Sequence, residues 1–130
     1  MRRSFVEAII VFDPVTFRIE EVNRGALVLL GRTHDQLAGL SMNALLRGAD
    51  PERLAAVVGT LASGQPDATT LVLEYQPARG RSIAVEVVLQ SVELPGGTRT
   101  IVAIARDIRD RIEAQVRLQR LAEAEHARAA

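Results

Sequence analysis

The segment TTLVLEYQPARGRSIAVEVVLQSVELPGGTRTIVAIARDIRDR, Thr69–Arg111, decides the fold of this chain. Apolar and polar residues alternate along it, which is the period of a β-strand that buries one face. The turn segments PARGR and PGGTR divide it into three runs, and such short turns join antiparallel neighbours. We therefore predict three consecutive antiparallel strands. The residues predicted to share the buried face of the first two are Leu71, Leu73, Tyr75, Ile83, Val85, Val87 and Leu89.

The opposite face of this predicted sheet also carries apolar residues. Val88 and Val92 lie on it in the second run, and the third run has apolar residues on both faces, Ile101 and Ala103 on one and Val102 and Ile104 on the other. An antiparallel sheet with one solvated face alternates more cleanly than this. We therefore expect the outer face to be covered, either by a terminal segment or by a second copy of the chain.

The N-terminal part of the chain predicts a hairpin followed by a short helix. EAIIVFD (7–13) and PVTFRIEEVN (14–23) are rich in strand-forming residues, and the Asp-Pro pair between them is typical of a turn. Asn23 is placed to cap a helix with the sequence RGALVLLG (24–31). Gly31 is placed to end that helix.

The next segment, THDQLAGLSMNALLRG (33–48), predicts two short helical turns rather than one helix. Thr33 and Ser41 are suitable N-cap residues because their hydroxyl groups accept hydrogen bonds from free backbone N–H groups. Gly39 and Gly48 mark the breaks.

The longest helix of this half has the clearest start. Asp50 is predicted to cap it, with Pro51 at the first helical position and Glu52 in the first turn. Gly64 is predicted to end it. Its apolar face comprises Leu54, Val57, Val58 and Leu61, at the spacing of an amphipathic helix.

Composition limits the classes of function. The 130 residues, 48% of them hydrophobic, suit one domain with an appendage. Sixteen basic residues balance sixteen acidic ones, which argues against nucleic-acid binding, and the absence of Cys excludes disulfides and thiolate metal sites. No signal peptide and no apolar run of about 18 residues is present, so we expect a soluble, cytoplasmic chain without a membrane span.

The order of these elements resembles the PAS sensory domains over roughly residues 5 to 110. The resemblance implies an α+β fold, a five-stranded antiparallel sheet in the order 2-1-5-4-3 with short helices on one face and a C-terminal exit helix. It divides the chain into a sensory domain, residues 1–108, and a connector helix, residues 109–130. Asn23 matches the Asn that opens the first helix of the family. Asp107-Ile108-Arg109 matches its Asp-Ile-Thr exit motif, with Arg109 in place of Thr.

The same resemblance raises the question of a cofactor, because PAS relatives hold haem, flavin or metabolites between the sheet and the helices. No covalent flavin is expected without Cys, and no haem ligand is evident because the long helix contains no His. His34 and His126 are interpreted as surface residues, and no metal site is predicted.

The aromatic residues Phe5, Phe12, Phe17 and Tyr75 are few for stacking a flavin. The cofactor is therefore unknown. An apolar pocket and a filled core are alternative interpretations of the same interior residues. Arg79 and Arg81 are interpreted as a solvated turn or, alternatively, as a site for an anion. The candidates for the pocket are Leu40, Met42, Leu45, Leu46, Val57, Leu61, Tyr75 and Leu89.

No enzymatic activity is predicted within this chain. A nucleophile elbow, a phosphate-binding glycine loop and a pair of metal-binding histidines are all missing from the sequence. Glu20 and Glu21 are adjacent on a predicted strand, so their carboxylates point to opposite faces and do not share a proton.

The tail from Arg106 onward has strong helix-forming composition, without Gly or Pro. Two interpretations remain open: the helix folds back on its own sheet, or it pairs with a second copy as a connector, which we favour. The apolar residues assigned to its contact face are Ile112, Val116, Leu118 and Leu121, together with Ile108 and Ala122.

We therefore expect a PAS sensor and dimerisation module of a larger bacterial signalling protein. It responds to an unknown small ligand or partner, and it transmits the response through Asp107 and the exit helix to an output domain beyond Ala130. The tail resembles connectors that precede diguanylate cyclase and histidine kinase domains, and Leu118 with Leu121-Ala122 favours the cyclase. The alternative is a ligand-free protein–protein interaction domain that holds two output domains together.

Overall fold

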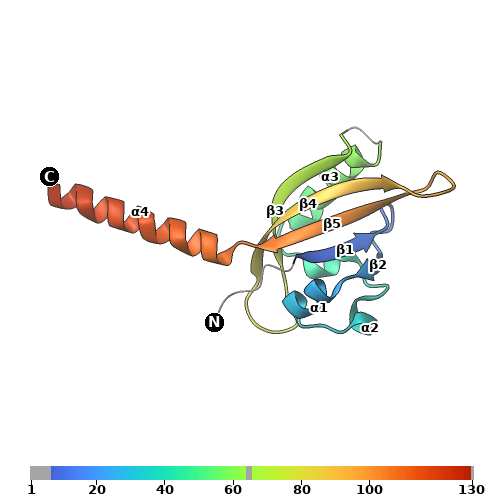
Figure 1. Ribbon diagram of the computed structural model, residues 1–130, viewed down its shortest axis with the longest axis horizontal. Helices are drawn as coiled ribbons and strands as arrows, with labels where there is room; N and C mark the ends of the chain where they lie inside the picture. Colours follow the sequence, from blue (N-terminus) through green and yellow to red (C-terminus); the bar gives the residue numbers. More distant parts are fainter. Residues whose placement is uncertain (1–6, 64–65, 130) are drawn as a thin grey trace.

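The three strands predicted from Thr69–Arg111 form one side of a five-stranded antiparallel sheet (Figure 1). The computed structural model describes residues 7–63 and 66–129, with side chains up to Arg128, so Phe5 and Gly64 lie outside the described residues. The order of the strands is β2-β1-β5-β4-β3, as predicted. The elements are β1 (Ala8–Phe12), β2 (Ile19–Val22), α1 (Arg24–Leu30), α2 (His34–Leu37), the 3-10 helix η1 (Met42–Leu45), α3 (Asp50–Leu61), β3 (Ala68–Tyr75), β4 (Ile83–Glu93), β5 (Arg99–Asp107) and α4 (Arg109–Ala129).

The register of the sheet places the predicted buried residues on one face. Leu73 pairs with Val85, Leu89 with Ala103, and Ala103 with Ile10 of the first strand. These residues are buried, and α1, α2, η1 and α3 close over them to complete a single apolar core.

The outer face of the sheet remains partly open. Val72 and Val88 are exposed there, and Val92, Val102 and Ile104 are half-buried. Helices α1, α2 and α3 lie on the core side, and α4 extends away from the sheet (Figure 1). Within residues 7–63 and 66–129, neither end of the chain covers this face. Coverage by a second copy stays a prediction.

The turn between β1 and β2 is built on Asp13. Its Oδ1 accepts hydrogen bonds from the backbone N–H groups of Val15 and Thr16, at 2.8 and 2.9 Å. These two N–H groups lower the pKa of the Asp13 carboxyl below its usual value, because they stabilise the charged form. Phe17 then adopts a positive φ of 64°, and its ring packs against Phe12 with 5.5 Å between the centroids.

Three of the short helical segments begin as predicted, and α1 also ends as predicted. Asn23, Thr33 and Ser41 each accept a hydrogen bond from a backbone N–H group in the first turn of α1, α2 and η1. Gly31 ends α1 in the left-handed conformation that favours glycine, with φ of 62°.

The predicted N-cap of α3 is wrong by one residue. Asp50 is the first helical residue, and Ala49 takes the N-cap position without a side-chain hydrogen bond. The reason is that the Asp50 carboxylate has other partners. Its Oδ1 lies 2.8 Å from Nη1 of Arg53, and its Oδ2 accepts the backbone N–H of Glu74 in β3, also at 2.8 Å. Asp50 therefore joins the start of α3 to an edge strand.

We expect Asp50→Ala to lower the free energy of unfolding by about 1–2 kcal/mol, because it removes an ion pair and leaves the Glu74 N–H without its carboxylate. Urea denaturation followed by circular dichroism measures the change. Glu52→Ala is the matched control, since it removes a first-turn acid that only complements the helix dipole, at about 0.3–0.5 kcal/mol. Equal losses in the two variants would contradict the bridging role of Asp50.

Candidate functional site

The eight predicted pocket residues lie together in one apolar cluster between the sheet and the helices. Six are buried, whereas Leu40 and Val57 are partly buried and pack against the others. The structure therefore brings the eight residues together, as side chains packed against one another. The six buried members are Met42, Leu45, Leu46, Leu61, Tyr75 and Leu89.

Tyr75 is the polar exception within this cluster. Its side chain is fully buried, and its hydroxyl group has no hydrogen-bond partner among the described residues. Burial raises the pKa of the Tyr75 phenol well above its usual value of 10, because the apolar surroundings disfavour the phenolate. An unpaired buried hydroxyl costs about 1–3 kcal/mol. The Tyr75 hydroxyl is thus a donor positioned for any acceptor that enters the core.

Asn23 connects the first strand to the first helix. Its Oδ1 accepts hydrogen bonds from the N–H groups of Ile9 and Ala26, at 2.8 and 2.9 Å, and its Nδ2 donates to the Glu7 carbonyl at 2.9 Å. One amide group therefore caps α1 and binds the backbone at the start of β1. This extends its predicted helix-capping role.

Asp107 and Arg109 form the junction between β5 and α4. Asp107 Oδ1 accepts the backbone N–H of Arg109 at 2.9 Å, and its Oδ2 lies 2.6 Å from Nη2 of the same residue. This contact raises the pKa of the Arg109 guanidinium. Ile108 between them is buried, and its N–H donates to the Ala84 carbonyl at 3.1 Å. Arg109 thus supplies an ion pair at the position where the family has Thr.

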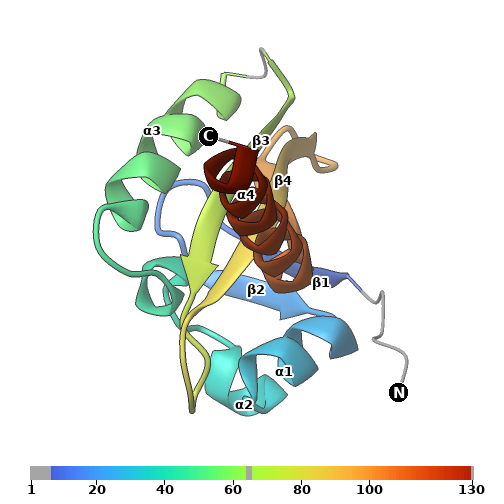
Figure 2. The same cartoon turned by 90° about the vertical axis from the view of Figure 1, so that its left-hand side faces the viewer.

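The predicted contact residues of α4 are exposed. The helix extends away from the domain, with its axis toward the viewer in Figure 2. Within the described chain, it has no packing partner along most of its length. The exposed fractions are 38% for Ile112, 42% for Val116, 65% for Leu118 and 61% for Leu121.

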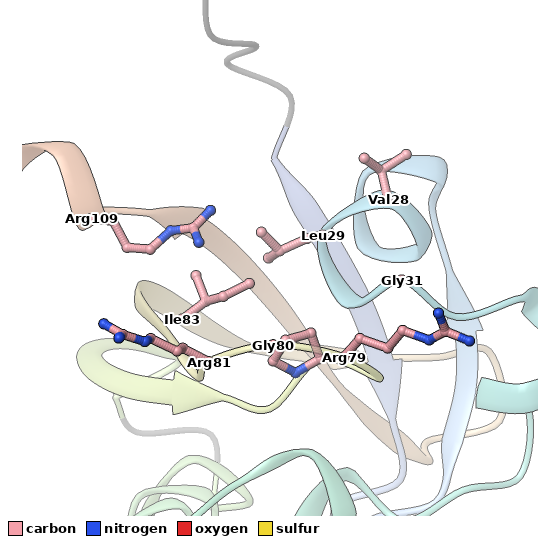
Figure 3. A pocket seen from close by; sticks show the side chains of 9 residues that line it. Val28, Leu29, Gly31, Arg79, Gly80, Arg81, Ile83 and Arg109 are labelled. Carbon is pink, nitrogen blue, oxygen red and sulfur yellow. The ribbon is translucent and has the colours of Figure 1, made fainter.

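A hollow of about 380 Å³ opens beside this junction. It lies between the end of α1, the β3–β4 loop and the start of α4. Figure 3 shows Arg81 and Arg109 on either side of Ile83, with Leu29 opposite the Arg109 guanidinium. The sequence indicated Arg79 and Arg81 as an alternative anion site, but it did not indicate Arg109 or Leu29. These residues are far apart in the chain, so only the folded topology brings them together.

Comparison with known proteins agrees with this geometry. The family model described as PAS domain matches residues 6–110. The chain belongs to the PAS domain family. Its fold is therefore that of a sensory module, a class that is not itself catalytic.

Solved PAS domains share this fold. A PAS domain of an HTR-like protein from Haloarcula marismortui is 28% identical, with a TM-score of 0.67, over 78% of this chain and 81% of that one. A domain of a sensory box sensor histidine kinase/response regulator from Geobacter sulfurreducens is 26% identical, with a TM-score of 0.63, over 78% and 82%. A PAS domain from Colwellia psychrerythraea is 23% identical, with a TM-score of 0.69, over 78% and 86%. No curated protein matches the sequence.

The histidines of this PAS domain lie at the surface. His34 is exposed beside Asp35, at 3.8 Å, and His126 is exposed on α4. Among the described residues, no three His, Asp or Glu side chains gather closely enough to hold a metal ion. Within residues 7–63 and 66–129, no helix combines the length and apolar character required to cross a bilayer.

Tyr75 makes the core of this PAS domain testable by alkaline titration. The chain has one Tyr, no Cys and no Lys, so Tyr75 is its only side chain that titrates between about pH 9 and 12. The unfolded chain releases the phenol proton near pH 10, whereas the folded chain retains it. We therefore expect the free energy of unfolding to decrease above pH 10, by about 1.4 kcal/mol per pH unit.

Tyr75→Phe is expected to abolish this alkaline decrease and to leave stability at pH 7 unchanged or higher, because the variant removes a hydroxyl without a partner. Urea denaturation across pH 7–12 measures stability, and absorbance at 295 nm measures phenolate. If Tyr75→Phe lowers the free energy of unfolding at pH 7 by more than about 1 kcal/mol, a ligand or water accepts a hydrogen bond from the Tyr75 hydroxyl in solution.

Proposed function

We propose that this PAS domain is the sensor and dimerisation module of a signal-transduction protein, and that it signals through α4 to an output domain of the same polypeptide. The observation that carries the proposal is the continuity between β5 and α4. β5 ends at Asp107 and α4 begins at Arg109, with only the buried Ile108 between them. A shift in the sheet therefore moves the start of the helix directly.

The sheet side of this junction is the part of the fold that a ligand in the core would move. Leu89 and Ala103 are paired neighbours in β4 and β5, and both face the apolar cluster. Val85 pairs with Asp107 in the same ladder. A change in packing around Leu89 thus reaches Asp107 along two adjacent strands. We assign residues 1–108 to the sensory domain and residues 109–130 to the connector helix.

Dimerisation is supported by the exposed apolar residues of α4 and by the common tendency of PAS domains to dimerise. An isolated helix of this length is marginally stable in water, and most helices gain stability by packing an apolar face. Ile112 and Val116 lie one turn apart on one face. A second copy of α4 supplies the same face by symmetry.

The output domain follows from relatives and from the connector. A histidine kinase is favoured by the Geobacter sulfurreducens relative, whose title names a sensor histidine kinase/response regulator. A diguanylate cyclase is the second candidate, on the spacing of the connector. A cytoplasmic location agrees with either output.

The competing function is a ligand-free interaction domain, and the packing of the core favours it. Leu45, Leu61 and Leu89 are fully buried and leave the interior filled. Native mass spectrometry of the purified chain and a thermal-shift screen against a metabolite panel distinguish the two functions. A retained small molecule, or a raised melting temperature, supports the sensor. If the chain retains no small molecule and no metabolite raises its melting temperature, the ligand-free dimerisation function is supported instead.

We expect the full chain to be dimeric at high micromolar concentration and Ile112→Glu/Val116→Glu to be monomeric, because two carboxylates would enter the apolar seam. Light scattering over a concentration series measures the change. Arg117→Glu is the matched control, since it also changes the net charge by −2 but on another face of α4. A wild-type monomer, or equal dissociation in both variants, would refute pairing through this face.

A further inference from the structure

The hollow beside the exit helix combines a basic rim with an apolar floor. Arg79, Arg81 and Arg109 contribute the rim, and the buried Ile83 and Pro77 contribute the floor together with Leu29. Figure 3 shows the Leu29 side chain pointing toward the Arg109 guanidinium. Arg81 extends from the loop to the same side as Arg109, whereas Arg79 extends to the opposite side below Gly31. The volume of about 380 Å³ lies within the range of small-molecule sites, about 300–1,000 Å³.

The loop that carries Arg79 and Arg81 is held in place before any ligand binds. The Ala78 N–H donates to the Leu30 carbonyl at 2.9 Å, which ties the loop to the end of α1. The Gln76 amide donates to the Gly80 carbonyl at 3.2 Å and accepts from Arg47 at 2.7 Å. A site formed by a fixed loop loses less conformational entropy on binding than a mobile one.

The charge of the rim is not balanced within the hollow. Among the described residues, Arg79 and Arg81 have no hydrogen-bond or ion-pair partner, and no acidic residue is among those that line the hollow. Arg109 is paired with Asp107, but a guanidinium has five N–H donors and this contact uses only its Nε and Nη2 atoms. The rim therefore keeps donors for an anion.

We propose that this hollow binds a small amphipathic anion, a carboxylate or phosphate monoester attached to an apolar body. Arg81 and Arg109 bind the anionic group, because guanidinium groups match planar and tetrahedral oxyanions. Leu29, Pro77 and Ile83 contact the apolar body. The site opens at the surface, and its floor shares Ile83 and Leu29 with the core that contains Tyr75. None of the eight predicted pocket residues lines it, so binding there does not require a ligand in the core.

Binding at this site reaches the exit helix through Arg109. Its guanidinium faces the hollow and also holds Asp107, at the residue where α4 begins. An anion that draws on Arg109 therefore competes with Asp107 and changes the first turn of α4. This second step rests on the proposed signalling role of α4, whereas the binding step does not.

The test uses 1-naphthyl phosphate as the probe, titrated into the ¹⁵N-labelled full chain at low salt. We expect saturable shifts in the backbone amides of residues 28–31, 79–83 and 109–112. Inorganic phosphate and 1-naphthol are expected to bind at least about tenfold more weakly, because the first lacks the apolar body and the second lacks the anionic group. Shifts confined to other residues, or equal binding of all three compounds, would overturn the site.

Matched single variants show which arginines of the rim bind the probe. We expect Arg81→Gln to lower the affinity for the probe about five- to tenfold and Arg79→Gln to lower it less. Arg117→Gln on α4 is expected to leave the affinity unchanged. Equal weakening by all three variants would mean diffuse attraction rather than a site. Tighter binding of a tetraglutamate peptide than of the probe would replace the small anion with an acidic protein partner.

Binding in the hollow and its coupling to α4 can be overturned independently of each other. Shifts at residues 79–83 without shifts at 109–112 would remove Arg109 from the site and overturn the coupling to α4, while the dimerisation of α4 is read independently by light scattering. Loss of dimerisation with retained binding would overturn the proposed signalling helix and leave the anion site in place.

Discussion

Pairing between the first strand and the last is the constraint on which this structure depends. β1 lies between β2 and β5, and Ala8–Phe12 pairs residue by residue with Ile101–Ala105. This contact joins segments about ninety positions apart, so the chain between them must be ordered when it forms. Between β1 and β5 in the chain, β2, β3 and β4 complete the sheet, and α1, α2, η1 and α3 lie on one side of it. Asn23 fixes the first part of that path, because one amide binds both β1 and α1.

The same constraint determines where α4 begins. β5 is central in the sheet, so the chain leaves the domain from its middle rather than from an edge. The departing helix makes few contacts with its own domain, apart from those near β4 such as Arg111 with Glu86 at 3.5 Å. Its position is therefore set by Asp107, Ile108 and whatever packs against its apolar face. Weak internal support makes the helix easy to redirect, which is a property that a connector needs.

Local patterns in the sequence predict the strands and caps well, because those features depend on neighbours within a few residues. The alternation of Leu71 to Leu89 gives the buried face, and Thr33 and Ser41 act as caps because their partners are two or three residues away. Local patterns do not predict contacts between residues that are far apart in the sequence. The order of the sheet comes from the resemblance to PAS domains, Asp50 is diverted from its cap by β3, and the hollow combines three distant segments.

The packed core limits what an interior ligand can be. Opening about 100 Å³ among Leu45, Leu61 and Leu89 costs about 2–3 kcal/mol, on the scale measured for cavities in protein cores. An acceptor placed on the Tyr75 hydroxyl recovers about 1–3 kcal/mol of the cost of leaving that group unpaired. The two quantities are similar, so a ligand without an acceptor starts at a disadvantage that its apolar contacts alone must overcome. A small interior ligand that carries an acceptor for Tyr75 would therefore have the lowest net cost of entry, whereas the surface hollow is already open and requires no such opening.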